Sequence, residues 1–146
     1  MTRISKSKFG KTSFQKLLGH NLSIMTAWSE LSDILEKNVR LSASLKEQVR
    51  RTLAQSNECA YCKAKGKPDE AIFDEKTSVA VGFATVFQHH AKGNLPDSAF
   101  DILEEYFSEA EISELCAFIC FTTAQQYFGA MMKLEADEEI DAESHA

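Results

Sequence analysis

Apolar residues recur at helical spacing along nearly the whole of this 146-residue chain. The clearest series has steps of four, three and four residues, which place its members on one helix face: Ile24, Trp28, Leu31 and Leu35. Similar series run through residues 45–53, 72–87, 100–107 and 112–134. No segment shows the strict apolar–polar alternation of a β-strand, and 6 Gly and 2 Pro are too few for the turns of a β-sandwich or barrel. The sequence therefore predicts an all-α bundle.

Two capping boxes, each a Ser followed three residues later by a Glu, predict where two of these helices begin. Ser44 with Glu47 would begin the helix over residues 45–53, and Ser108 with Glu111 would begin the last helix. The Gly-Asn-Leu-Pro segment at residues 93–96 predicts a break before the short helix near residue 100.

Charge is concentrated at the two ends of the chain. Residues 1–29 contain basic residues and no acid, whereas residues 134–146 contain acidic residues and no Lys or Arg. We expect a basic arm over residues 1–20, a single helical domain over residues 21–134, and an acidic tail over residues 135–146. Both arms would be solvated, or would pair with each other or across subunits.

Net charge and hydropathy exclude two classes of partner. A net charge of -6 disfavours nucleic-acid binding, which needs a basic face. Residues 115–132 carry no charge, but their Thr and Gln side chains favour a buried helix over a membrane span. The basic N-terminal region lacks the apolar run of a signal peptide. We therefore expect a cytoplasmic protein that binds neither nucleic acid nor membrane.

Cys59 and Cys62 are the most specific chemical feature of the sequence. Two cysteines three positions apart can cycle between dithiol and disulfide, and helix N–H groups with Lys63 and Lys65 nearby would stabilise a thiolate. A thiolate can attack a peroxide oxygen, and the second cysteine can then convert the sulfenic acid to a disulfide. The position nearer the helix N-terminus favours Cys59 as the nucleophile.

A zinc site is the alternative interpretation of this pair. Cys116 and Cys120 would complete a set of four thiolates, but they lie in an apolar helical segment where Cys usually packs as a small apolar residue. We therefore expect no metal and no cofactor. His89 and His90 could bind a metal or move a proton, although a solvated helix end is the simpler interpretation.

Glu47, eleven intervening residues and Cys59-x-x-Cys62 resemble the signature of the alkylhydroperoxidase-D-like group of the carboxymuconolactone decarboxylase family. The resemblance covers roughly residues 20–135. It implies an all-α fold built on an antiparallel helical hairpin and assembled into homo-oligomers such as trimers or hexamers. It also implies hydroperoxide reduction, with Cys62 as the nucleophile, Cys59 as the resolving thiol, Glu47 as the base of a proton relay, and an external dithiol as the reductant.

This sequence departs from the family pattern at the proton relay. The family motif has a His four residues after the second cysteine, where this chain has Gly66, and Tyr61 stands between the cysteines where the family often has His. Tyr61 could replace part of the missing group, although a pKa of about 10 makes it a poor base at neutral pH. His89 or His90 could also reach the site from another helix.

Glu47 also has a purely structural interpretation, because its capping box with Ser44 is sufficient to explain it. A straight helix would place Glu47 about 18 Å from Cys59. A catalytic Glu47 therefore requires a bend in the chain near Ser56 and Asn57, or a contact from a neighbouring subunit.

Three functions remain open from the sequence. The first is a weak alkyl hydroperoxide reductase of the antioxidant type, which uses the cysteine pair with help from Glu47 or Tyr61. The second is a non-catalytic oligomer that senses redox state or binds a small ligand. The third is a decarboxylase of carboxylated lactones, for which the basic residues available are Arg40, Arg50 and Arg51.

Overall fold

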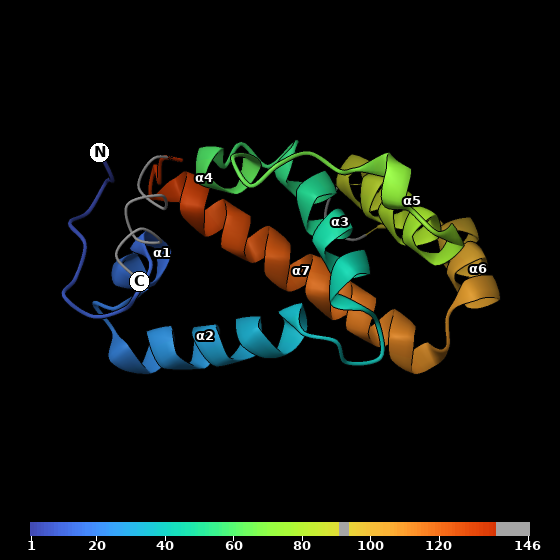
Figure 1. The fold of residues 1–146 in the computed structure, drawn as a ribbon, viewed down its shortest axis with the longest axis horizontal. Helices are drawn as coiled ribbons and strands as arrows, with labels where there is room; N and C mark the ends of the chain where they lie inside the picture. Colours follow the sequence, from blue (N-terminus) through green and yellow to red (C-terminus); the bar gives the residue numbers. More distant parts are fainter. Residues whose placement is uncertain (91–93, 137–146) are drawn as a thin grey trace.

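The computed structural model describes residues 1–90 and 94–136, and all the regular structure in these ranges is helical (Figure 1). The elements are α1 (Ser13–Leu18), α2 (Leu22–Glu36), α3 (Ala43–Ala54), α4 (Ala60–Lys63), the 3-10 turn η1 (Glu70–Ile72), α5 (Glu75–His89), α6 (Asp97–Tyr106) and α7 (Glu109–Met131). The predicted all-α class is confirmed for the described residues. None of their helices is both long enough and apolar enough to cross a membrane.

α7 organises the fold because it contacts α2, α3, α4 and α6 along its length (Figure 1). Its first half packs with α3, α5 and α6 in the main core, whose fully enclosed members include Val49, Leu53, Ala80, Leu103 and Leu115. A second group of buried residues, here named the sulfur cluster, comprises Leu17, Ala54, Cys59, Tyr61, Cys62 and Leu134. The two cysteines therefore lie outside the main core, near the C-terminal end of α7.

The predicted starts of α3 and α7 have different outcomes. The capping box of Ser108 and Glu111 is present at the start of α7. The box predicted at Ser44 and Glu47 is wrong, because α3 begins earlier and Ser42 is its N-cap. The Ser42 hydroxyl oxygen accepts the Leu45 N–H at 3.1 Å, which supplies the cap that Ser44 was expected to provide. Glu47 is thereby free of any capping role.

α5 begins later than its apolar spacing predicted. The series was expected to start at Ile72, but this residue lies in η1 and is 57% exposed. Asp74 caps α5 by accepting the Thr77 N–H at 2.8 Å. The helix ends at His89, ahead of the break predicted at residues 93–96, of which residue 93 lies outside the described ranges.

The N-terminal segment differs from the solvated arm that its charge predicted. Residues 13–18 form α1, which begins with a capping box between Thr12 and Gln15 and buries Leu17 and Leu18. The apolar members of this short helix outweigh the flanking lysines, because their burial removes them from water. In the acidic tail, residues 137–146 lie outside the described part of the chain.

Candidate functional site

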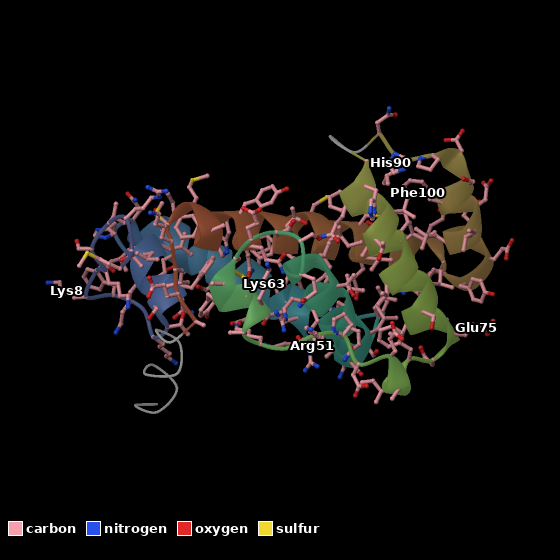
Figure 2. All side chains as sticks on the ribbon, turned by 90° about the horizontal axis from the view of Figure 1, so that it is seen from above. Lys8, Arg51, Lys63, Glu75, His90 and Phe100 are labelled. Carbon is pink, nitrogen blue, oxygen red and sulfur yellow. A yellow bond between two sulfur atoms is a disulfide. The ribbon has the colours of Figure 1, made fainter. Side chains whose placement is uncertain are left out.

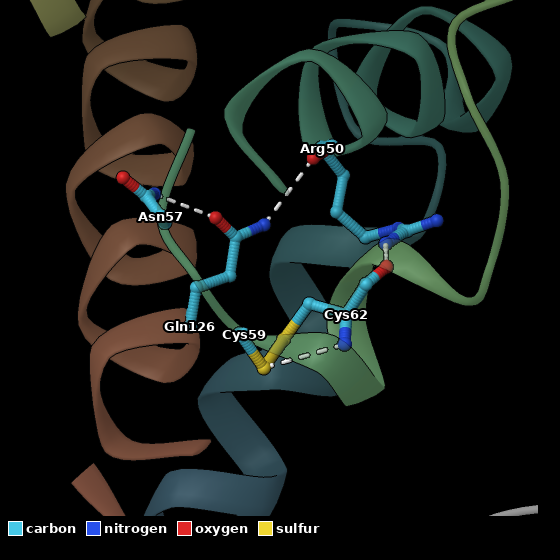
Figure 3. Close-up of a disulfide and its surroundings, with 5 residues drawn as sticks. All are labelled: Arg50, Asn57, Cys59, Cys62 and Gln126. Carbon is cyan, nitrogen blue, oxygen red and sulfur yellow. Dashed lines mark hydrogen bonds between the residues drawn. A yellow bond between two sulfur atoms is a disulfide. The ribbon is translucent and has the colours of Figure 1, made fainter. Parts of the chain in front are cut away.

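The cysteine pair lies where the chain turns sharply between α3 and α4. α3 ends at Ala54, Glu58 adopts a left-handed backbone conformation with φ of 52°, and Cys59 is the N-cap of α4. A disulfide joins Cys59 to Cys62, and the Cys62 N–H donates to the Cys59 Sγ at 3.3 Å (Figure 3). The bend that a functional Glu47 requires near residues 56–57 is therefore present.

One buried side chain of α7 forms hydrogen bonds both to the loop that precedes Cys59 and to α3. Gln126 is 2% exposed, and its Oε1 accepts a hydrogen bond from Asn57 Nδ2 at 2.7 Å. Its Nε2 donates to the Arg50 carbonyl oxygen at 3.2 Å, so a single amide connects the loop, α3 and α7 (Figure 3). Gln126 is not among the site residues predicted from the sequence, although a glutamine within an apolar helical segment is a signal that could have pointed to it.

Gly129 of α7 is a second site residue that was not predicted from the sequence. A Cβ atom at this position would lie 2.8 Å from the Cys59 Sγ and 3.9 Å from the Cys62 Sγ. The disulfide therefore packs directly on the helix backbone, and a glycine allows this close approach. A lone glycine inside a long apolar helix is the pattern that would have pointed to it.

The two sulfur-bearing residues differ in access. Cys59 is completely buried and Cys62 is 7% exposed. A cavity of about 240 Å³ is lined by Cys62 and not by Cys59. A small molecule in this cavity would meet Cys62, whereas Cys59 lies behind it against α7. Access therefore favours Cys62 as the nucleophile, whereas position at the helix N-terminus favoured Cys59.

The cavity lies among α1, α2, α4 and α7, and part of its wall is aromatic. The ring centroid of Phe14 lies 6.3 Å from that of Trp28 and 6.4 Å from that of Tyr61. Tyr61 is 6% exposed, lines the cavity with Cys62, and has the Lys65 ammonium 4.8 Å from its ring centroid. The structure thus brings Tyr61 and Cys62 together, as the sequence predicted, in a cavity whose wall combines aromatic rings with polar and charged side chains.

Glu47 is connected to the cysteine pair indirectly, through hydrogen bonds to arginine side chains. Its carboxylate accepts hydrogen bonds from Arg50 at 2.6 and 2.9 Å and from Arg51 at 3.0 Å. Arg50 Nη1 in turn donates to the Cys62 carbonyl oxygen at 3.3 Å. Burial raises the pKa of Glu47, but the hydrogen bonds and charges of the two arginines bring it below its ordinary value. A carboxylate held in this way is a weaker base and a firm anchor for Arg50.

The position of the family's relay histidine is occupied by a turn glycine. Gly66 has a φ of 114°, a left-handed conformation that L side chains rarely adopt. The adjacent turn is held by Arg51 Nη1, which donates to the Lys67 carbonyl oxygen at 3.2 Å. A histidine could not replace Gly66 here without backbone strain.

The histidines of α5 do not reach the cysteine pair within one copy of the chain. Both His89 and His90 are exposed and neither lines the cavity, and Figure 2 shows His90 at the end of α5, well away from Lys63. The His89 ring Nδ1 lies 2.7 Å from the Thr85 carbonyl oxygen of its own helix.

The second pair of cysteines stays reduced and separate from the first. Cys116 is half-buried and packs against the main core, as predicted, whereas Cys120 is exposed, which corrects the prediction that both are core residues. Burial, together with Cys120 nearby, raises the pKa of the Cys116 thiol. No group of three or more His, Cys, Asp or Glu side chains in the described ranges is arranged to hold a metal ion.

Comparison with known proteins identifies similar folds but no close relative. No protein-family model matches the chain, and neither does any curated protein. Among solved structures, the apo form of the debrominase Bmp8 superimposes with a TM-score of 0.69 at 18% identity, over 92% of this chain and 83% of that chain. A cysteine-to-alanine variant of Bmp8 in complex with 2,3,4-tribromopyrrole gives a TM-score of 0.67 at 18% identity, over 92% of this chain and 82% of that chain. These structural neighbours are enzymes that share the all-helical fold.

Proposed function

We propose that this protein is a thiol-dependent oxidoreductase of the alkylhydroperoxidase-D-like group, and that it reduces a small hydroperoxide through Cys62 and Cys59. The observation that carries the proposal is the placement of Cys62 on the wall of a cavity, with Cys59 enclosed behind it and already bonded to it. The likeness in fold to an enzyme adds support for catalysis.

The reaction begins with the reduced pair. The Cys62 thiolate attacks the terminal oxygen of the hydroperoxide, the O–O bond breaks, and the alkoxide takes a proton and leaves as an alcohol. The Cys59 thiolate then attacks the sulfur of the Cys62 sulfenic acid, the S–O bond breaks as the disulfide forms, and the hydroxide takes a proton and leaves as water. An external dithiol, supplied in a reducing cytoplasm, returns the disulfide to two thiols.

Arg50 and Glu47 have positioning roles in this proposal. Arg50 lines the cavity and bonds to the Cys62 backbone, so its positive charge favours the Cys62 thiolate. Glu47 holds Arg50 in place through two hydrogen bonds. Tyr61 lines the same cavity as Cys62, and its hydroxyl is the proposed proton donor to the leaving group.

A count of free thiols tests the proposal. The fully reduced protein has four thiols, and one equivalent of cumene hydroperoxide is expected to remove two. Cys120→Ser, the matched control, is expected to lose two of its three, whereas Cys62→Ser forms no intramolecular disulfide. Retention of all four thiols in the wild type would exclude peroxide reduction. Oxidation without turnover in the presence of a dithiol would instead favour the redox-sensing oligomer.

Reductive debromination is a second candidate, favoured by the aromatic wall of the cavity and by the fold it shares with a debrominase. In that reaction two thiols and an aryl bromide give a disulfide, the debrominated ring and hydrogen bromide. Incubation of the reduced protein with 2,3,4-tribromopyrrole distinguishes the two, because bromide release accompanies thiol loss only in the second case.

We also propose that the chain assembles with copies of itself through α2 and α7. Both helices expose large apolar side chains: Leu22, Ile24, Leu31, Ile34, Tyr127 and Met131 are 45–63% exposed. Exposed apolar patches of this kind commonly mark interfaces. Sedimentation velocity is expected to show a trimer or hexamer, and Tyr127→Lys and Ile34→Lys to dissociate it; a monomer at all concentrations would contradict the proposal.

A further inference from the structure

We propose that Gln126 of α7 is a positioning residue for the cysteine pair, because it holds the loop before Cys59 in the conformation that brings the two sulfur atoms together. The consequence is a pair whose equilibrium favours the disulfide, so that loss of Gln126 makes the disulfide easier to reduce. This inference deepens the function proposed above and rests on it for the cycle between dithiol and disulfide.

The loop over residues 55–58 joins α3 to α4 and ends in an unfavourable backbone conformation. The backbone N–H groups of Gln55 and Ser56 each donate to a carbonyl oxygen of α3 at 3.3 Å, so the first part of the loop continues that helix. Glu58, directly before Cys59, then has a φ of 52°, a left-handed conformation that is costly for a residue with a side chain of this length. Such a conformation persists where the surroundings hold it.

Gln126 provides a hydrogen-bonded hold on this loop from α7. Its Oε1 accepts a hydrogen bond at 2.7 Å from the Nδ2 of Asn57, the residue before Glu58. Its Nε2 donates to the Arg50 carbonyl oxygen of α3 at 3.2 Å (Figure 3). The Gln126 side chain is buried, so water does not compete for either bond. One amide therefore fixes the position of the loop relative to both helices.

Gly129 gives the same face of α7 a second contact with the chain around Glu58. It lies three residues after Gln126, a spacing that places both on one side of the helix. A Cβ atom at Gly129 would lie 2.8 Å from the Cys59 Sγ. α7 thus holds the chain on both sides of Glu58, by a hydrogen bond at Asn57 and by close packing at Cys59.

An anchored loop lowers the entropic cost of closing the disulfide. When the loop is already ordered in the dithiol form, the sulfur–sulfur bond has little more chain to order. Without the bonds of Gln126, the dithiol form gains loop conformations that the disulfide form lacks, and closure costs more. Ordering about one residue of backbone corresponds to roughly a tenfold change in an equilibrium constant. A residue that served stability alone would affect both forms equally and leave the reduction potential unchanged.

The equilibrium of the pair with dithiothreitol measures this effect. One oxidised dithiothreitol and the two thiols of the protein exchange to give the protein disulfide and one reduced dithiothreitol, and mass spectrometry after acid quenching and alkylation counts the two forms of the pair. Gln126→Met keeps the length of the side chain and removes both hydrogen bonds. We expect its equilibrium constant for oxidation to fall about threefold to tenfold, which raises the reduction potential by about 14–30 mV.

The neighbouring glutamine of α7 gives a matched control. Gln125 Nε2 donates to the Ser32 Oγ of α2 at 3.0 Å, so Gln125→Met makes the same chemical change and removes a bond that does not involve the cysteine loop. It should leave the equilibrium constant unchanged. Asn57→Ala removes the bond between the loop and Gln126, and we expect it to lower the constant in the same direction as Gln126→Met.

A constant that is unchanged or larger in Gln126→Met or in Asn57→Ala would overturn the inference, and so would an equal fall in Gln125→Met. If Gln126→Met does not fold, Asn57→Ala decides by the same criterion. No peroxide takes part in this equilibrium, so its result is separate from the thiol count that tests the proposed function. The pair can depend on Gln126 even if a hydroperoxide does not oxidise it, and the converse result is equally distinguishable.

Discussion

In its first half, up to about Ile119, α7 packs into the main core, whereas from Thr122 onward it faces the sulfur cluster and the cavity. Glu114, whose side chain is 9% exposed, is the most enclosed carboxylate of the first half, and it is fully paired. Glu114 accepts hydrogen bonds from the Arg40 and Leu41 N–H groups at 2.9 and 3.0 Å and from Lys46 Nζ at 3.1 Å. This half follows the rule that buried polar groups find partners.

The second half departs from that rule in several places at once. Among the described residues, the two buried side-chain polar atoms without a partner are Trp28 Nε1, on a ring that packs against Phe121 and Phe128, and Thr123 Oγ1. The same half contains Gly129, a residue of low helix propensity at a position where a Cβ atom would collide with the disulfide. The candidate site therefore lies where packing and helix propensity are both less favourable than in the main core, as is common for functional regions.

The largest expected effect lies in the paired half. The Lys46 side chain is 1% exposed, so Glu114→Gln would leave its ammonium group buried beside a neutral amide. We expect the free energy of unfolding to fall by about 3–5 kcal/mol. Urea denaturation measures it, and Glu104→Gln on the exposed surface of α6 is the control, with a change below about 0.5 kcal/mol. A loss below 1 kcal/mol in Glu114→Gln would remove the contrast between the two halves.

Two helical glycines give the next comparison. Gly129→Ala places a methyl group 2.8 Å from the Cys59 Sγ, whereas Gly82→Ala on α5 meets no atom within 4 Å. We expect the first to destabilise the oxidised protein by about 1–3 kcal/mol and the second to stabilise it by about 0.5–1 kcal/mol. The loss in Gly129→Ala should shrink when the disulfide is reduced, because a free Cys59 side chain can move. Equal effects of the two substitutions would show that the disulfide does not press on α7.

The all-α class and the start of α7 could be predicted from the sequence because local spacing and capping determine them. The start of α3 could not, because only Ser44 has a Glu three residues later, yet it is Ser42 that accepts the Leu45 N–H and caps the helix. Charge misled the prediction for residues 13–18, since three apolar side chains in a short helix outweigh the lysines around them.

The cysteine pair and Tyr61 could be found from local spacing, but their surroundings could not. Gln126 and Gly129 are more than sixty residues away in the chain and meet the pair only through the path of α7. The same is true of Trp28, whose ring packs against Phe121 and Phe128 of α7. Long-range packing of this kind leaves no periodic signal in the sequence.

Acid should affect the two carboxylates differently. Burial raises the pKa of Glu114 and of Glu47, but their hydrogen bonds and cationic partners bring both below the ordinary value of 4.5. A lowered folded-state pKa contributes stability above the unfolded-state pKa, and that contribution is lost as pH falls below about 4.5 through the folded value.

Glu114→Gln should flatten this loss of stability between pH 5 and about pH 3. Glu47→Gln should flatten it less, because its side chain is 39% exposed and exposed ion pairs contribute below about 1 kcal/mol. Equal flattening in both variants would contradict the difference in burial.

The smallest effect concerns the two reduced cysteines of α7, which lie four residues apart and differ in exposure. Cys120 is exposed, whereas Cys116 is half-buried and burial raises its pKa. Each unit by which a pKa is raised lowers the reactive thiolate about tenfold at a fixed pH. In the oxidised, dilute protein at neutral pH, N-ethylmaleimide should therefore label Cys120 several times faster than Cys116, with no change in stability. Mass spectrometry of timed samples measures both rates, and Cys120→Ser should remove only the fast phase. If Cys120 is labelled slowly when dilute and unfolding accelerates its labelling, its side chain is not accessible as the fold requires. If labelling slows only as concentration rises, a second copy covers this face of α7.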